Sequence, residues 1–126
     1  MSIQVKDINN EIVAIKVMQF AGGERHVQID ATRLNQLNGR VFIRAQINNS
    51  QDLMDYLLIE NVLLNQKLEI EIEMPYFPYA RQDRICATGQ AFSLDIMTKL
   101  LNINTEKFPQ QRKSITVWDA HSTTTE

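Results

Sequence analysis

Beyond residue 40 the chain alternates between strand-like and helix-like segments, and this alternation restricts the fold more than any other feature. Residues 41–47, 68–74 and 114–118 are rich in β-branched and other apolar residues, as strands are. Residues 51–66 and 92–102 instead carry apolar residues at helical spacing. Strands that alternate with helices favour a mostly parallel sheet flanked by helices. The sequence therefore predicts an α/β fold, with 68–74 as a buried strand.

The N-terminal segment predicts a β-hairpin. Residues 3–6 and 11–19 are strand-like, and the Asp-Ile-Asn-Asn sequence at 7–10 predicts the turn that joins them. Residues 20–24 then contain two adjacent glycines, which permit a tight reversal, and residues 26–29 alternate as a half-buried strand should. Taken from the residues alone, 20–24 is a turn between two strands.

Composition is that of an ordinary globular chain and excludes several classes of function. The 126 residues are enough for one domain with a single core. A net charge of −2 gives no basic footprint for nucleic acid. No apolar run approaches the roughly 20 residues of a membrane span, and the N-terminus lacks a signal-peptide pattern. The single cysteine, Cys86, cannot form an internal disulfide, which fits a reducing, cytoplasmic location.

The segment that follows the 68–74 strand has an unusual composition. Residues 74–84 read Met-Pro-Tyr-Phe-Pro-Tyr-Ala-Arg-Gln-Asp-Arg, with three aromatics, two prolines and three charges. Arginine is suited to bidentate phosphate binding, and ligands of open α/β sheets bind beyond the carboxyl ends of strands. The residues alone leave two interpretations open: a phosphate site that includes Arg81 and Arg84, or a rigid surface loop with solvated charges.

A carboxylate and an imidazole follow at the end of the last predicted strand. Asp119 and His121 are two positions apart, so both point to the same side of an extended backbone. Such side chains can hold a divalent cation directly or through its waters. Two ligands do not make a metal site, and the residues by themselves favour a structural role. The other histidine, His26, has only Glu24 close by and is also interpreted as structural.

Four segments, taken in order, carry a resemblance to a known family. Residues 75–84, PYFPYARQDR, resemble the signature of the ribose-phosphate diphosphokinases, which make phosphoribosyl pyrophosphate. Residues 20–24 resemble the early Phe-x-(Asp/Asn)-x-Glu turn of that family, and residues 52–58 resemble its first long helix. Residues 117–121, Val-Trp-Asp-Ala-His, resemble its strand ending in Asp-Leu-His. The resemblance implies the phosphoribosyltransferase-like N-terminal domain of such an enzyme, here with an N-terminal hairpin.

The resemblance also implies a reaction and a binding site. Family members move the β,γ-diphosphate of ATP to the anomeric hydroxyl of ribose 5-phosphate, with Mg²⁺ as cofactor. By resemblance, Arg81 and Gln82 bind ATP. His121 would bind both ATP and the metal ion, and Asp119 is a weaker candidate for a metal ligand.

Two further ATP-binding residues follow from the resemblance of the 20–24 turn. Phe20 would stack on the adenine, and Glu24 would hydrogen-bond its amino edge. In the family these two residues come from a neighbouring subunit, which implies a homo-oligomer with the ATP site across an interface. Gly22 stands where family members often have Asp or Asn.

The family's ribose-phosphate loop and its basic catalytic loop have no counterpart in these 126 residues. Residues 1–126 are therefore expected to be a single N-terminal domain that carries no catalytic residue and is inactive alone. The alternative is a non-catalytic, family-like regulatory or oligomerisation module, to which Gly22 and the short N-terminus point. An unrelated doubly wound nucleotide-binding domain is a third interpretation.

Overall fold

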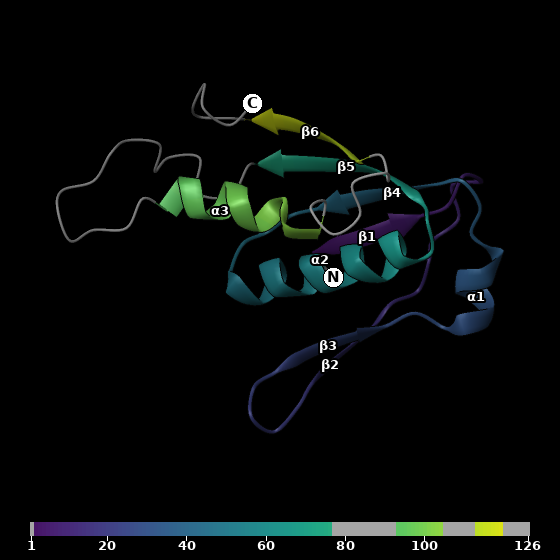
Figure 1. The fold of residues 1–126 in the computed structure, drawn as a ribbon, viewed down its shortest axis with the longest axis horizontal. Helices are drawn as coiled ribbons and strands as arrows, with labels where there is room; N and C mark the ends of the chain where they lie inside the picture. Colours follow the sequence, from purple (N-terminus) through teal and green to yellow (C-terminus); the bar gives the residue numbers. More distant parts are fainter. Residues whose placement is uncertain (1, 77–92, 105–112, 120–126) are drawn as a thin grey trace, which may run out of the picture.

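The computed structural model describes residues 2–76, 93–104 and 113–119. Figure 1 shows a sheet, helices against it, and a separate two-stranded hairpin. In chain order the elements are β1 (Ile3–Lys6), β2 (Lys16–Gln19), β3 (Arg25–Gln28), α1 (Ala31–Gln36), β4 (Arg40–Ala45), α2 (Ser50–Asn65), β5 (Glu69–Tyr76), α3 (Ser93–Leu101) and β6 (Lys113–Asp119). Among these residues no helix has the length and apolar character needed to cross a membrane.

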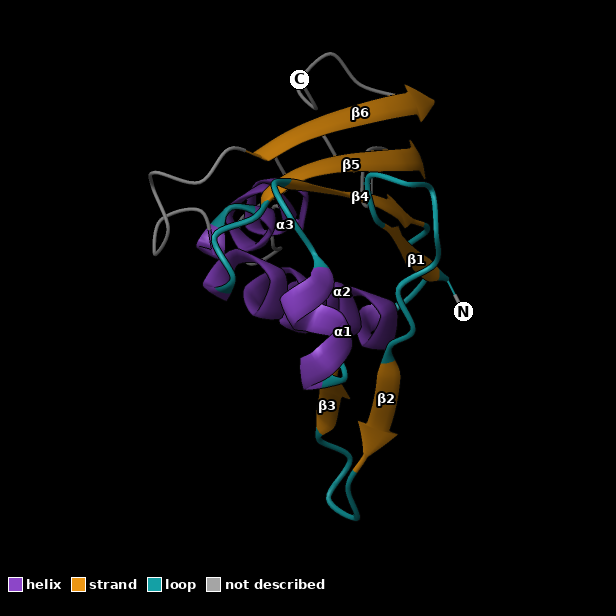
Figure 2. Cartoon of the chain, turned by 90° about the vertical axis from the view of Figure 1, so that its right-hand side faces the viewer, coloured by secondary structure: helices purple, strands orange, loops and turns teal. Residues whose placement is uncertain are grey.

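The main sheet has the strand order β1-β4-β5-β6. β4, β5 and β6 are parallel, and β1 joins the edge in the antiparallel direction. Figure 2 shows α2 and α3 against the same face of this sheet. The prediction of a mostly parallel sheet with helices is confirmed, and each strand and helix predicted beyond residue 40 is present within a few residues of its expected bounds.

The strand β5 is buried on one face only. The prediction that residues 68–74 form a buried strand is therefore correct for one of the two faces. Its inward residues are Ile70, Ile72 and Met74, and its outward residues are Glu69, Glu71 and Glu73. The outward glutamates form ion pairs with Arg40 and Arg44 of β4, at nitrogen–oxygen distances of 2.6–3.1 Å. Charge pairing across adjacent strands thus explains why glutamate alternates with isoleucine in this strand.

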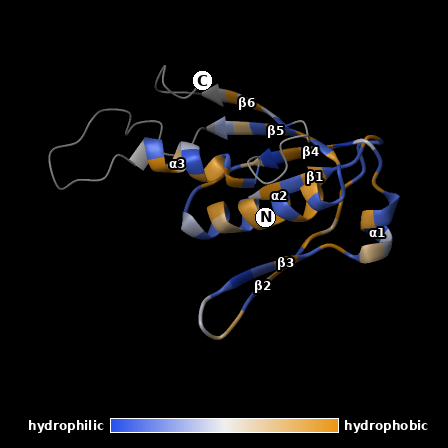
Figure 3. Cartoon of the chain, in the orientation of Figure 1, coloured by the Kyte–Doolittle hydropathy of each residue, from blue (hydrophilic) through white to orange (hydrophobic). Residues whose placement is uncertain are grey.

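The helix α2 supplies most of the helical side of the core. Asn49 caps its N-terminus, and the Asn49 side chain accepts a hydrogen bond from the Asp52 backbone N–H at 2.8 Å. Tyr56, Ile59 and Leu63 are fully buried along the face that packs on the sheet. Figure 3 shows hydrophobic and hydrophilic residues alternating along α2, as expected for a helix with one covered face.

An N-terminal β-hairpin is present, and β2 and β3 form it. The predicted pairing of residues 3–6 with 11–19 is wrong beyond the turn, because only an isolated bridge joins Lys6 to Ile12. β1 pairs instead with β4, which buries its inward side chains in the main core. The reversal at 20–24, predicted as a turn between strands, is confirmed as the connection of β2 to β3.

The turn at residues 7–11 is held by Asp7. Its carboxylate accepts hydrogen bonds from the backbone N–H groups of Asn9 and Glu11 at 2.9 and 3.0 Å. Arg33 donates a further hydrogen bond to it at 2.9 Å. These hydrogen bonds, that of Glu11 first and that of Arg33 next, lower the pKa of Asp7. Since Arg33 belongs to α1, the same carboxylate holds both the turn and the helix.

The short helix α1 lies in a segment for which the sequence predicted no element, because residues 31–40 are mostly polar without a clear period. Asp30 caps this helix and accepts a hydrogen bond from the Arg33 backbone N–H at 3.2 Å. Leu34 packs partly against the core. The helix is therefore set by its cap, its Arg33 ion pair and one apolar contact.

Candidate functional site

The carboxyl ends of the parallel strands β4, β5 and β6 meet at one edge of the sheet. The last register pair between β5 and β6 places Tyr76 opposite Asp119. The aromatic and arginine-rich segment that begins at residue 77 and the segment that begins at residue 120 therefore leave the sheet from adjacent strands. Ligands of open α/β sheets bind at such an edge.

Several predicted site residues are not described by the structure. Arg81, Gln82 and His121 lie outside the described residues, and Asp119 is placed as the last residue of β6. The backbone thus brings the strand before the arginine segment next to the strand before His121. Within the part of the chain that is described, no group of three or more potential metal ligands is present.

Phe20 and Glu24 come together at the tip of the β2–β3 hairpin. The Phe20 backbone N–H donates to the Glu24 carbonyl at 2.9 Å, and the Gly23 N–H donates to the Phe20 carbonyl at 2.9 Å. Gly23 has a φ of 92°, a conformation that glycine adopts without strain. The turn therefore carries both predicted adenine-binding residues on one hydrogen-bonded reversal.

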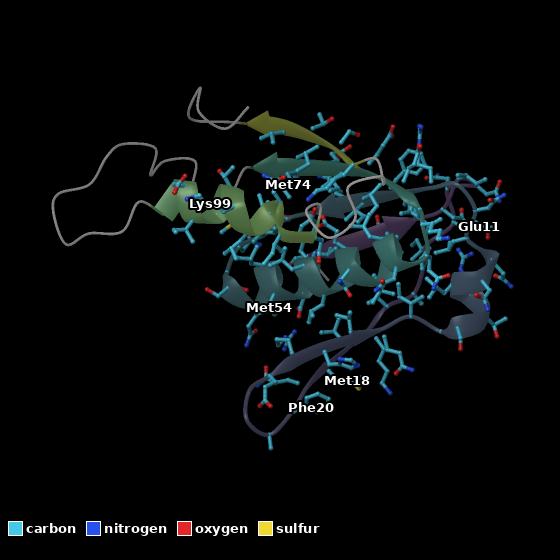
Figure 4. All side chains as sticks on the ribbon, viewed as in Figure 1. Glu11, Met18, Phe20, Met54, Met74 and Lys99 are labelled. Carbon is cyan, nitrogen blue, oxygen red and sulfur yellow. The ribbon has the colours of Figure 1, made fainter. Side chains whose placement is uncertain are left out.

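The ring of Phe20 is half exposed and has one aromatic neighbour among the described residues. Its exposed fraction is 52 %. It stacks on His26 at a centroid distance of 5.9 Å and an interplanar angle of 26°. Figure 4 shows Phe20 near the tip of the hairpin, beyond Met18. His26 is exposed and supports this ring, a contact that the sequence did not indicate, because it arises only from the pairing of β2 with β3.

Gly22 and the carboxylate of Glu24 share one space. A Cβ atom at position 22 would overlap Oε1 of Glu24, so the Glu24 side chain would have to move to admit one. The Glu24 carboxylate therefore folds back over the turn into the volume that a side chain at position 22 would need. Because Glu24 is exposed and flexible, a change of its rotamer would make room for a side chain at position 22.

One hollow among the described residues lies elsewhere. It has a volume of about 400 Å³ and lies over the outer face of the sheet, with Lys6, Phe42, Arg44 and Glu73 in its lining. Of the predicted site residues whose side chains the structure describes, neither Phe20 nor Glu24 borders it. Its charges are largely those that pair β4 with β5, so we assign the candidate site to the carboxyl edge and the hairpin turn instead.

The described elements define an α/β domain whose three parallel strands end at one edge of the sheet. The family model for the N-terminal domain of ribose phosphate pyrophosphokinase matches residues 3–104. The chain belongs to this family, as its resemblance in sequence predicted.

Similar proteins agree with this assignment. A ribose-phosphate pyrophosphokinase of Thermococcus kodakarensis is 23 % identical over 105 residues, which are 82 % of this chain and 36 % of that protein. One of Methanobrevibacter smithii is 26 % identical over 99 residues, 76 % of this chain and 32 % of that protein. The chain thus spans about a third of the length of these relatives.

A solved structure supports the fold. The phosphoribosylpyrophosphate synthetase of Mycobacterium smegmatis superimposes with a TM-score of 0.63 at 20 % identity, over 87 % of this chain and 42 % of that chain. At this identity the likeness establishes the fold alone. It confirms the mostly parallel, helix-flanked architecture.

Proposed function

We propose that this chain is the ATP-binding part of a ribose-phosphate diphosphokinase, which transfers the diphosphate of ATP to ribose 5-phosphate. The observation that carries the proposal is the pairing of Tyr76 with Asp119 at the end of two parallel strands. It makes the PYFPYARQDR segment and the Asp-Ala-His segment start side by side at the ligand edge. Family membership supports the same reaction class.

At this edge the residues of the chain bind and orient rather than react. Arg81, with a planar fork of donors, would bind phosphate oxygens, and Gln82 would add a neutral donor beside it. Phosphoryl and diphosphoryl transfer depend on such positioning and on charge neutralisation. No residue of the chain is assigned a catalytic role in bond making or breaking.

The donor set at the end of β6 fits Mg²⁺ in part. Asp119 offers carboxylate oxygens, which Mg²⁺ prefers, and it lies on the strand next to β5. His121 offers an imidazole, which suits contact through a metal-bound water. When bound, the ion would neutralise the charge of the phosphates. His121 would hold the ion together with ATP, and Asp119 is the weaker candidate for a ligand.

The adenine would meet Phe20 and Glu24 of a neighbouring copy of the chain. In Figures 1 and 2 the layer of α2 lies between the hairpin and the strands β5 and β6. The turn of one chain is therefore remote from its own ligand edge. Its half-exposed aromatic ring is of the kind that interfaces and stacked bases cover. This separation supports a homo-oligomer with the ATP site across an interface.

A regulatory or oligomerisation module of the same family is the second candidate. The glycine at position 22, where family members often have Asp or Asn, favours it. Such a module would form the same oligomer and use the turn as a contact between copies. It would bind no ATP at the carboxyl edge.

Calorimetric titration with ATP and Mg²⁺ tests the proposal, on the protein in its natural length and after sedimentation has established its oligomeric state. Phe20→Ala is expected to weaken ATP binding roughly 5- to 150-fold, the range that loss of one base–aromatic stack produces. Phe42→Ala is the matched control, because Phe42 is an exposed ring on the outer face of the sheet, with 38 % exposure. It should leave the affinity unchanged.

Two variants at the carboxyl edge complete this test. His121→Ala should weaken binding of ATP with Mg²⁺, and Arg81→Lys should do so as well, because a point charge replaces a fork. Unchanged affinity in both variants would reject the ATP site at the carboxyl edge. An intact oligomer without ATP binding would favour the module instead.

A further inference from the structure

The β2–β3 hairpin depends on the rest of the chain for its direction. It forms a two-stranded sheet of its own, separate from the four-stranded sheet. An isolated two-stranded ribbon is marginally stable at best. Its base is anchored, since Val27 and Ile29 are buried in the core. The tip, which carries Phe20, lies several residues beyond this anchor.

Arg25 joins the end of the hairpin next to the turn to α2. The Arg25 side chain donates two hydrogen bonds to Asp55, from Nε to Oδ1 at 3.0 Å and from Nη2 to Oδ2 at 2.8 Å. Its third nitrogen, Nη1, donates to Gln19 Oε1 at 2.9 Å. Gln51 of α2 also reaches Gln19, at 3.4 Å. One guanidinium therefore joins β3, β2 and the helix.

Arg25 lies directly beside the turn of the hairpin. Gln19 and Arg25 are the last register pair before the reversal. The next residues toward the turn are Phe20 and Glu24. The Phe20 backbone N–H donates to the Glu24 carbonyl at 2.9 Å and so closes the turn. The Arg25–Asp55 pair thus lies one residue from both proposed adenine contacts.

The burial of the pair separates it from an ordinary surface ion pair. The side chain of Asp55 is 8 % exposed and that of Arg25 is 20 % exposed. Exposed ion pairs contribute little because water screens them, whereas a bidentate pair with a buried carboxylate fixes a geometry. Asp55 lies in the first half of α2, the helix that follows the carboxyl end of β4.

We propose that Arg25 and Asp55 are positioning residues that hold the Phe20–Glu24 turn at one angle to α2. The ring of Phe20 and the carboxylate of Glu24 then meet the nucleotide as a preorganised unit, without an ordering cost at each binding event. This inference rests on the proposed function of the turn. It extends that function to two residues that touch no ligand.

Amide exchange of the turn provides a readout that is independent of the nucleotide. The reporters are the Phe20 and Gly23 amides, which carry the hydrogen bonds of the reversal. Arg25→Met is expected to speed their exchange about tenfold or more, since hydrogen bonds to charged groups are among the stronger ones. The amides of α2 should keep their rates.

Three further variants make the exchange result specific. The double variant Arg25→Met with Asp55→Asn removes the pair without leaving a buried carboxylate unpartnered. It therefore separates loss of the pair from unfolding caused by an unpaired buried charge. Arg25→Lys should restore part of the protection. Arg40→Met is the matched control, because it removes an arginine that pairs with Glu69 on the outer face of the sheet.

Titration of the same variants with ATP and Mg²⁺ completes the test. Arg25→Met should weaken ATP binding, with Arg25→Lys in between and Arg40→Met unchanged. Unaltered exchange at the turn in both Arg25→Met and the double variant would overturn the proposal, whatever the affinity. Faster exchange with unaltered affinity would overturn it too, provided that Phe20→Ala does weaken binding.

The remaining outcome concerns the proposed function itself. If Phe20→Ala leaves the affinity unchanged, the turn does not bind the nucleotide, and the preorganising role of the pair is overturned with it. The exchange rates still report whether the pair orders the turn. The two failures are therefore distinguishable.

Discussion

Lys113→Met is expected to destabilise the domain strongly, because it breaks a buried ionic network. Glu60 is fully buried, and its Oε2 lies 2.9 Å from Lys113 Nζ. The same carboxylate accepts hydrogen bonds from the Tyr56 hydroxyl at 2.5 Å and from Asn104 Nδ2 at 3.3 Å. These residues join α2, the end of the α3 region and the first residue of β6.

The size of the effect follows from what remains around Glu60. Removing one partner of a buried ion pair costs about 3–5 kcal/mol, because the other charge stays buried. Tyr56 and Asn104 still donate to the carboxylate in the variant, so we expect the lower end, about 3 kcal/mol. Lys113 also donates to the Leu101 carbonyl, and loss of this hydrogen bond acts in the same direction.

Urea unfolding followed by circular dichroism measures this loss, with the slope of the transition as a check that the unfolding reaction is unchanged. Adding Glu60→Gln to Lys113→Met should recover much of the stability, because no buried charge is left. Lys99→Met is the matched control: its pair with Asp95 is exposed and should contribute less than about 1 kcal/mol. A loss below about 1 kcal/mol for Lys113→Met would refute the reasoning.

Two predictions concern pH. Burial, followed by the charge of Glu60 and its hydrogen bond, raises the pKa of Tyr56 well above 10.0. The unfolded chain then ionises first, so stability should fall as the pH rises above about 10, and urea unfolding of Tyr56→Phe should show less of this fall. The lowered pKa of Asp7 has the opposite sign: its contribution is present above the unfolded value of 3.8 and is lost as the pH falls through the lower folded value. Asp7→Asn should therefore destabilise the domain at about pH 7 and much less at about pH 2 in the same assay.

The part of the fold that the sequence predicted is the part in which local pattern and tertiary environment agree. The apolar period of α2 matches the face that packs on the sheet, and the strand–helix alternation matches the parallel strands β4, β5 and β6. The partner of β1 was not predictable in this way. Alternation shows that one face of a strand is buried, and pairing with residues 11–19 or with β4 satisfies that condition equally.

The helix α1 and the Arg25–Asp55 pair were missed for different reasons. An Asp30 cap followed by a short helix is a local signal, so closer attention to capping could have found α1 despite its polar sequence. Arg25 and Asp55 are 30 positions apart and meet only because the hairpin packs on α2. Nothing in the neighbourhood of either residue in the sequence indicates the other.

For the candidate site, the residues alone predicted the reversal at 20–24, and family resemblance supplied the roles of Phe20 and Glu24. The structure adds the exposure of the Phe20 ring, which neither the sequence pattern nor the family resemblance gives. Gly23 and the backbone hydrogen bonds are needed by any hairpin turn, so they say nothing about ligand binding. The half-exposed ring of Phe20 takes no part in the hydrogen bonds that close the reversal, which join backbone groups. The exposed ring of Phe20 is therefore available for contact with a second surface, which under the proposed function is ATP bound to a neighbouring copy.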